Sequence, residues 1–352
     1  MSFFSEATVK AVPGVLDVVA VVSNPRRYAT RYHHYRNFKE HMLFSGVRLT
    51  TVELVHGKRC FEVTSNTNPR DVQLRTEHEI WHKENLINIG ISRLPDDWEY
   101  VAWIDADVTF NRPNWVYETL HALQHWDIVQ LFSHSLNLGP KYEPIFDSHV
   151  SRDAVQRSVI VSWLYGHFHQ LNKVDVDTGN LYHEGKLVPG DGSLRTHEQV
   201  QRSHGHSRYQ WHSGLAWAAR RSAITAIGGL VDWAILGSAD RHMADMMIGN
   251  TKWNRKLSPG YQQSLDLAAA RFKVLNGNFG YVDGLITHHW HGKLVNRRYL
   301  DRWLLLYKHQ FDPIADLYRD EQGLWQLTPN KPELRDDIRR YLMARDEDSI
   351  DI

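Results

Sequence analysis

Short apolar runs alternate with amphipathic segments along the first 132 residues of the chain. The runs are rich in β-branched side chains and have the length of strands that are buried on both faces of a sheet. The segments between them place apolar side chains at helical spacing and end at turn-forming residues. The pattern predicts strands at 15–22, 47–55, 98–104 and 127–132, with 60–63 either extending the second strand or forming another, and helices at 28–43, 77–91 and 115–123. Such alternation is typical of an α/β fold with a mixed, mostly parallel sheet flanked by helices.

The pattern breaks down between residues 133 and 211. Pro, Gly, His and Asp are scattered through this stretch, and its one compact apolar run is 159–165. Its last part, 195–211, is rich in Arg and His. We interpret 133–211 as a long central insertion, which is either a surface loop or a lid over a binding site.

Regular patterning returns after residue 211. We expect strands at 214–219 and 280–286, and helices from Ser222 to Gly228, at 241–248 and at 261–274. Apolar residues on one face of 330–346 predict a further helix. The chain therefore divides into a first α/β half at 1–132, the insertion at 133–211, a second half at 212–300 and a C-terminal helical extension at 301–352.

Composition restricts the class of protein. The chain has 352 residues, 42% of them hydrophobic, which suits one large α/β domain with an insertion or two modest domains. Lys plus Arg and Asp plus Glu number 41 each, so a general basic coat for nucleic acid is disfavoured, although a local basic groove is not. A lone Cys60 makes no internal disulfide. With neither an 18-residue apolar run nor a signal-peptide pattern, we expect no membrane span. The 13 Trp favour an enzyme with an aromatic-lined cleft.

Four polar clusters lie at predicted strand ends or beside tight turns. In open α/β sheets, ligands bind at the carboxyl ends of the strands. The clusters are Asn24–Arg27, Asp105–Asp107, Gly237–Asp240 and His288–His291. Their common position indicates a single binding site more strongly than any one of them does.

Asp105 and Asp107 follow a strongly apolar predicted strand. Side chains two residues apart in an extended segment point the same way. Two converging carboxylates are costly unless a cation neutralises them, and hard oxygen ligands suit Mg²⁺ or Mn²⁺. A pair of this kind also occurs by chance in solvated loops. Here the buried strand before it favours a metal site.

Three histidines lie close together at 288, 289 and 291. An imidazole that completes a carboxylate site favours Mn²⁺ over Mg²⁺. His291 is the preferred ligand because Gly292 lets the backbone approach closely. The alternative for each of the three is a hydrogen-bonded structural histidine beside Trp290.

Asp240 lies in the first turn of a predicted helix, after Gly237. A carboxylate there complements the helix dipole without any catalytic role. The tight loop before it favours a second interpretation, a general base that points into a cleft.

With these residues in view, the chain resembles the metal-dependent glycosyltransferases of the GT-A fold, which use nucleotide-sugar donors. The order of the motifs is most similar to that of β-1,4-galactosyltransferases and of family-2-like bacterial and phage enzymes. The resemblance covers about residues 15–132 and 212–300. It is carried, in chain order, by Val18–Arg27, Lys83–Gly90, Trp103–Val108, Gly214–Trp217, Arg220–Ala223, Ile227–Leu230, His289–Gly292 and Arg297–Tyr299.

The resemblance implies a Rossmann-like sheet in which 1–132 binds the nucleotide-sugar donor and 212–300 holds the acceptor and the catalytic base. It implies Mn²⁺ or Mg²⁺ bound by Asp105, Asp107 and His291, and Asp240 as the base of an inverting reaction. The donor contacts are expected from Asn24, Arg26, Arg27, Lys83, Asp105 and Trp217.

Two features depart from the family pattern. Many relatives carry Glu-Asp at the position of the base, whereas this chain has Ala239 followed by Asp240. The insertion at 133–211 has no counterpart in them. Golgi galactosyltransferases have a membrane anchor, and because none is visible here we expect a cytoplasmic role.

The favoured function is transfer of a sugar, expected to be a hexose, from a nucleotide diphosphate sugar such as a UDP-sugar to an acceptor hydroxyl. The acceptor is a glycan or a hydroxymethylated DNA base of the phage type. Two other classes stay open: a nucleotidyltransferase on a similar sheet, which would want a Gly-rich phosphate loop, and a non-catalytic carbohydrate-binding protein. The sequence does not decide between inversion and retention or determine the oligomeric state.

Overall fold

The computed structural model describes residues 14–145, 155–164, 211–299 and 301–350. It also describes three short strands that form a separate sheet, β9 (Asn172–Val174), β10 (Leu181–His183) and β11 (Lys186–Leu187). Most of the predicted insertion, including the Arg- and His-rich stretch 195–210, lies outside these residues. The proposed lid is therefore not described.

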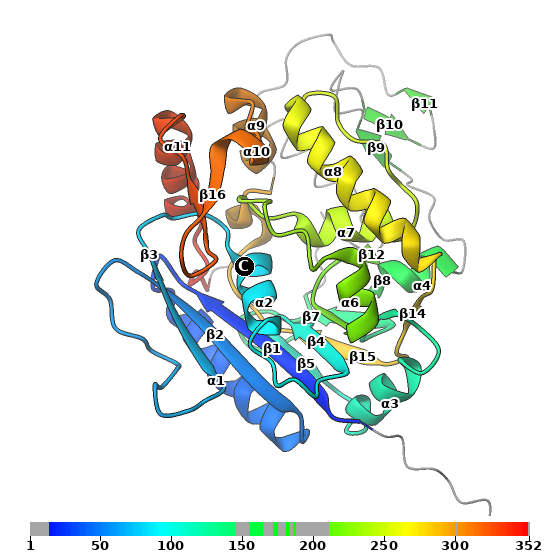
Figure 1. The fold of residues 1–352 in the computed structure, drawn as a ribbon. Coiled ribbons are helices and arrows are strands. Elements are labelled where there is room, and N and C mark those ends of the chain that lie inside the picture. Colours follow the sequence, from blue (N-terminus) through cyan, green and yellow to red (C-terminus); the bar gives the residue numbers. More distant parts are fainter. Residues whose placement is uncertain are drawn as a thin grey trace, which may run out of the picture.

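A seven-stranded sheet forms the centre of the molecule (Figure 1). Its strand order is β14-β6-β13-β4-β1-β2-β3. Four of its six strand pairings are parallel, and β13 runs antiparallel to both of its neighbours. The fold class predicted from the sequence is thereby confirmed. The strands are β1 (Leu16–Ser23), β2 (Arg48–His56), β3 (Asp71–Thr76), β4 (Tyr100–Ile104), β6 (Ile128–Gln130), β13 (Ala216–Arg220) and β14 (Phe279–Tyr281).

Alternate side chains of β1 enter two different cores. Val18 and Ala20 pack on the face covered by helices α1 (Ala29–Phe44) and α3 (Trp115–Ala122). Val19 packs on the opposite face, with side chains of the helices α2 (Lys83–Ile91), α6 (Arg221–Ile227), α7 (Ala239–Met247) and α8 (Pro259–Phe272). A strand buried on both faces reads as a continuous apolar run, which is the reason that β1 is recognisable in the sequence.

Helix α2 approaches the sheet closely at Gly90. A Cβ added there would lie 2.5 Å from Val19 Cγ1 and 2.9 Å from Val52 Cγ2, both in the core. We therefore expect Gly90→Ala to lower the free energy of unfolding by about 1–3 kcal/mol through overpacking. This loss should appear although alanine is the better helix former by about 1 kcal/mol. Denaturant unfolding checks it, and a variant as stable as the parent would show that α2 can shift away from the sheet.

A second sheet of five strands brings distant segments of the chain together. Its order is β12-β8-β7-β15-β5, and β15 pairs with β5 in antiparallel and with β7 in parallel orientation. Two of its members, β7 and β8, lie within the predicted insertion. The strands are β5 (Val108–Phe110), β7 (His134–Asn137), β8 (Val155–Ser158), β12 (Trp211–His212) and β15 (Leu285–His288).

Several elements differ from the sequence predictions. The single strand expected at 280–286 is split between β14 and β15, which belong to different sheets, because the chain bends at Gly284 with φ of 149°. Residues 60–63 form no strand, and β3 supplies the edge of the central sheet instead. Helix α6 begins at Arg221, so Ser222 is not its N-cap, although its expected end at Gly228 is confirmed. Helix α2 begins only at Lys83.

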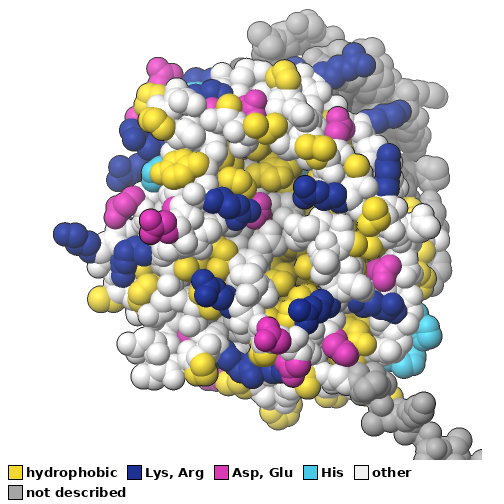
Figure 2. Space-filling model, viewed as in Figure 1, with side chains coloured by type: hydrophobic (Ala, Val, Ile, Leu, Met, Phe, Trp, Pro, Cys, Tyr) yellow, Lys and Arg dark blue, Asp and Glu magenta, His cyan; other side chains and the backbone are white. Residues whose placement is uncertain are grey.

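The C-terminal part after residue 300 contains more than helices. A hairpin of β16 (Leu317–Arg319) and β17 (Trp325–Leu327) accompanies the helices α9 (Asp301–His309), α10 (Pro313–Asp316) and α11 (Pro332–Met343). Outside this part, helix α4 (Val159–Leu164) packs against β8, β12 and β14. Among the described residues, every helix is too short or too polar to cross a membrane. Figure 2 shows basic and acidic side chains interspersed on one face, without a continuous basic band, as the balanced charge predicts.

Candidate metal and catalytic site

Asp107, His288 and His291 form a cluster whose potential ligand atoms all lie within 4.8 Å of one another. Asp107 Oδ2 lies 3.1 Å from His291 Nδ1 and 3.6 Å from His288 Nε2. The sequence prediction included Asp107 and His291 but left His288 as one of three alternatives. In the described part of the chain, this is the one cluster of three such residues.

The pairing of β5 with β15 explains how these residues meet. Asp107 immediately precedes β5, and His288 ends β15 opposite Val108. The backbone N–H of His289 donates to the Asp107 carbonyl oxygen at 2.8 Å, which fixes the histidine segment beside the carboxylate. Sheet pairing between segments 180 residues apart is invisible to sequence reasoning, whereas the residue types are not.

The donor set fits a divalent cation. Asp107 Oδ1 is buried and has no hydrogen-bond partner among the described residues, an arrangement that costs free energy unless another group satisfies it. His288 Nδ1 pairs with Asn137 Oδ1 at 2.8 Å, so a proton on Nδ1 leaves the Nε2 lone pair facing Asp107. One carboxylate and two imidazoles suit Mn²⁺ better than Mg²⁺.

Electrostatics keep Asp107 and His291 in the protonation states that a metal site requires. Burial by itself would raise the pKa of Asp107, but His288 and His291 outweigh it and hold that pKa well below its usual value. Burial and the nearby Arg297 lower the pKa of His291 to about 4. At neutral pH, Asp107 is therefore ionised and His291 is neutral.

Asp105 lies apart from this cluster, in an ion pair with Lys83 at the start of α2. Burial and the proximity of Asp107 raise the pKa of Asp105, while Lys83 opposes both. The backbone N–H of Asp105 donates to the Leu215 carbonyl oxygen at 2.7 Å. The two residues of this ion pair were both predicted to contact the nucleotide-sugar donor. The predicted role of Asp105 as a metal ligand stays a prediction.

Asp240 lies in the first turn of α7, where Gly237 and Ser238 both have positive φ. Its carboxylate lies beside Gly214, because a Cβ added to Gly214 would be only 2.7 Å from Asp240 Oδ2. The Ser213 hydroxyl donates to the same oxygen at 3.3 Å. Gly214 precedes β13, so this contact brings the carboxylate of α7 to the beginning of β13, an interior strand of the central sheet.

Cations surround Asp240 and determine its ionisation. Burial would raise the pKa of Asp240, but Lys83 and then Arg302 lower it below its usual value. Asp240 is therefore a carboxylate at neutral pH, which a general base must be. Its electrostatic interaction with Lys83 links it to the Asp105 pair.

The remaining predicted donor residues lie elsewhere along the sheet edge. Asn24 closes the turn after β1 through hydrogen bonds to Tyr28. Arg26 is paired with Glu79, and Arg27 lies 3.6 Å from Glu62 with its side chain 65% exposed. Trp217 is buried in β13 and donates its indole N–H to the Ser213 carbonyl oxygen at 3.0 Å. Within the described part of the chain, none of these four residues forms a hydrogen bond or ion pair with the metal cluster, and their roles stay predictions.

Sequence reasoning missed three groups beside the site. Glu84 follows Lys83 and is buried, and burial raises its pKa to about 7 although Lys83 opposes this. Arg297 and Arg302 form no ion pair with any described residue, yet both act electrostatically on the site. The sequence signal for the two arginines was their position just after the histidines. Glu84 had no distinguishing signal in the sequence, because an acidic residue at the start of a helix is common.

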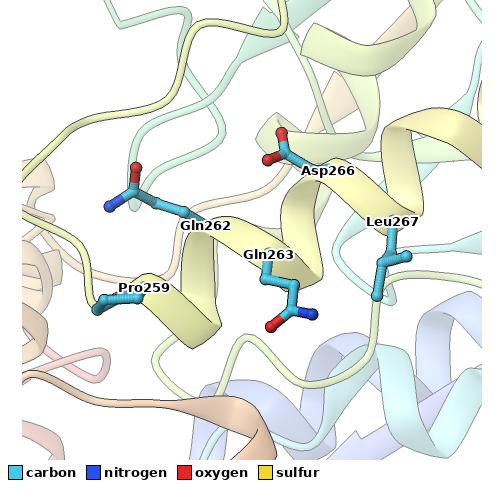
Figure 3. A pocket seen from close by; sticks show the side chains of 5 residues that line it. All are labelled: Pro259, Gln262, Gln263, Asp266 and Leu267. Atoms are coloured by element: carbon cyan, nitrogen blue, oxygen red, sulfur yellow. The ribbon is translucent and has the colours of Figure 1, made fainter.

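One shallow pocket of about 480 Å³ lies away from these residues, along helix α8 (Figure 3). Its lining comes from a single stripe of the helix, Pro259, Gln262, Gln263, Asp266 and Leu267. None of the predicted site residues contributes to it. The candidate site is therefore defined by its side chains rather than by this cavity.

No family model and no curated protein matches the chain. Among solved structures, it is similar to the catalytic domain of Drosophila β1,4-galactosyltransferase 7 in complex with xylobiose, at 11% identity and TM-score 0.38, covering 92% of this chain and 98% of that one. A variant of the same enzyme with manganese, UDP-Gal and xylobiose gives 10% identity, TM-score 0.39 and coverage of 91% and 97%. Staphylococcus aureus TarS gives 10% identity, TM-score 0.23 and coverage of 74% and 71%. The first two neighbours are glycosyltransferases, the class that the sequence resembles, but at these TM-scores the likeness carries no weight for activity.

Proposed function

We propose that this protein is a metal-dependent glycosyltransferase that moves a sugar from a nucleotide diphosphate sugar to an acceptor hydroxyl. The observation that carries the proposal is the presence of two carboxylates with different surroundings near Asp105, whose pKa both of them raise. Asp107 faces two imidazoles and has one oxygen without a partner among the described residues, and Asp240 is an ionised carboxylate outside that cluster. A metal ligand and a separate base are what this reaction needs.

Asp107, His288 and His291 would hold the cation, and Mn²⁺ is the expected ion. When bound, it supplies positive charge to the diphosphate that leaves as the glycosidic bond breaks. The chain's own cations act on the same charge. Lys83 is tied to Asp105, whereas Arg297 and Arg302 form no ion pair with a described residue. All three cations favour a dianionic group in this region.

Asp240 would accept the proton of the acceptor hydroxyl as that oxygen attacks the anomeric carbon. Its lowered pKa keeps it unprotonated, and it also makes the base weak, so proton transfer is expected late in the attack. Attack from the side opposite the leaving group inverts the anomeric centre. We therefore propose an inverting reaction, a hexose as the transferred sugar and UDP as its carrier.

The proposed acceptor is a glycan. Balanced charge and the absence of a continuous basic band on the viewed face do not favour a polyanion (Figure 2). A hydroxymethylated DNA base is the other acceptor that the resemblance suggested, and steep loss of duplex binding with added salt would support it.

A small change beside Asp240 tests its placement. Gly214 does not have positive φ, so alanine fits the backbone there, but its Cβ would press on Asp240 Oδ2. We expect Gly214→Ala to lower the transfer rate by about 100-fold, because displacing a catalytic group by about 1 Å has that effect. Ser213→Ala removes only a 3.3 Å hydrogen bond and is the matched control, with a smaller loss. Equal rates for Gly214→Ala and the parent would place the base elsewhere.

The proposed function is tested directly with a panel of nucleotide sugars and Mn²⁺, read by release of the nucleoside diphosphate. Release from one donor, abolished by a chelator, supports transfer. Release of pyrophosphate from a nucleoside triphosphate and a sugar phosphate would identify a nucleotidyltransferase instead. Sugar binding without metal and without turnover would identify a carbohydrate-binding protein.

A further inference from the structure

A short segment after helix α11, residues 345–349, contacts both the start of helix α1 and the segment that carries His291. We call it the C-terminal strap. At one end it holds the start of helix α1, which has no capping side chain of its own. The Asp348 carboxylate accepts hydrogen bonds from the N–H groups of Ala29 at 2.8 Å and Thr30 at 3.1 Å. The strap therefore supplies the cap of a helix more than 300 residues away in sequence.

The strap also holds both chain neighbours of His291. On one side, the Trp290 indole N–H donates to the Ser349 carbonyl oxygen at 2.7 Å. On the other side, Gly292 has φ of 83°, and a Cβ there would overlap the Asp346 carbonyl oxygen and lie 3.0 Å from Glu347 Cα. Gly292, which the sequence analysis linked to the predicted ligand His291, thus leaves the space in which the strap packs against this segment.

Buried ion pairs anchor the strap to the first helix. Glu347 accepts two hydrogen bonds from Arg31, at 2.6 and 2.7 Å, and lies 3.0 Å from Arg345. Side chains of Glu347 and Arg345 are only 4% and 7% exposed. Burial would raise the pKa of Glu347, but Arg31 and Arg345 lower it far below its usual value. Such pairs keep a segment in one place, because breaking one leaves an uncompensated buried charge.

Helix α1 also contacts the segment around His291 directly. His34 Nε2 lies 2.6 Å from the Trp290 carbonyl oxygen. The strap, α1 and the segment around His291 therefore contact one another pairwise. Asp107 and His288 are instead fixed by the pairing of β5 with β15, and among the described residues they form no hydrogen bond or ion pair with the strap.

We infer that the C-terminal strap positions His291 for metal binding. The inference rests on the metal site of the proposed function. A ligand must be held within about 0.5 Å of its productive position, and the strap fixes the residues on each side of this one. Losing the strap should leave a site of Asp107 and His288 with a poorly placed third ligand. Metal affinity should fall without a change in any ligand.

The test measures Mn²⁺ affinity by calorimetry on the purified chain and on variants. Removing residues 346–352 should raise the Kd for Mn²⁺ about 10-fold, the lower end of the effect of lost supporting contacts around a metal site. Trp290→Phe removes the indole donor to Ser349 and keeps an aromatic ring, although a smaller one, and it should raise the Kd about threefold. If the shortened chain does not fold, Trp290→Phe decides the question alone.

A double-mutant comparison distinguishes a role of the strap in positioning His291 from a general loss of stability. In a His291→Ala background, loss of the strap should leave the Kd unchanged, because the ligand that it positions is gone. Asp337→Asn is the matched control: it breaks pairs with Lys308 and His309 in the same C-terminal part, away from His291, and should lower the melting temperature but not Mn²⁺ affinity.

Two results would overturn the inference while sparing the metal site. One is an unchanged Kd in both the shortened chain and Trp290→Phe, and the other is an equal fold-change with and without His291. A parent chain that binds no Mn²⁺ at all would instead overturn the metal site itself, and with it the proposed function.

Discussion

Asp240→Asn should reduce sugar transfer by about 10²–10⁴-fold, the usual contribution of a positioned general base. The amide has nearly the same shape as the carboxylate, so the contacts with Ser213 and Gly214 are kept. What is lost is the ability to take the proton of the acceptor hydroxyl. Because Asp240 is not part of the metal cluster, Mn²⁺ and nucleotide binding should be unchanged.

The measurement compares turnover with metal and nucleotide affinity in the same preparation. Asp245→Asn is a suitable control, since Asp245 lies on the same helix but pairs with Arg241 at 2.7 Å instead of facing the site. It should keep nearly full activity. Transfer by Asp240→Asn within about threefold of the parent would reduce Asp240 to a residue that complements the helix dipole.

Asp107→Ala should abolish metal-dependent donor binding. Asp107 is the only carboxylate of its cluster, and the two imidazoles do not replace its negative charge. Lost contacts around a metal site already cost about 10–100-fold in affinity, so loss of this ligand should exceed that range. Titration with Mn²⁺ and UDP, together and separately, checks the expectation.

Asp97→Ala provides the control, because this carboxylate is 73% exposed and, among the described residues, forms an ion pair only with Arg48. It should leave binding unchanged. Parent-like affinity of Asp107→Ala for Mn²⁺ and UDP would show that the cluster is not the metal site. A heat-labile variant with intact affinity would assign Asp107 a structural role.

Local patterns predicted most of the sheet and two of the site's carboxylates. Strands buried on both faces, such as β1, have a continuous apolar signal, and Asp105 and Asp107 follow such a strand directly. Residue types at a strand end were therefore enough to predict the presence of a site.

The assembly of that site was beyond sequence reasoning, because it depends on contacts between distant segments. Nothing local distinguishes His288 from His289; the difference comes from the pairing of β15 with β5, which directs His288 towards Asp107. Lys83 and Asp105 were both assigned to the donor, but the ion pair between them could not be predicted from the sequence. Glu347 and Asp348 gave no signal at all, since acidic residues near a chain end are usually solvated.

The position of β13 has a consequence for how the chain is synthesised. β13 lies between β4 and β6, and it is made about 90 residues after β6. Until residue 220 leaves the ribosome, β4 has a bare hydrogen-bonding edge and β6 has no neighbour in the sheet, since its other partner β14 is made later still. Exposed strand edges of this kind pair readily with other chains. A nascent chain or a fragment that stops before β13 should therefore aggregate and depend on chaperones, and any division of this protein into halves has to keep β4, β6 and β13 together.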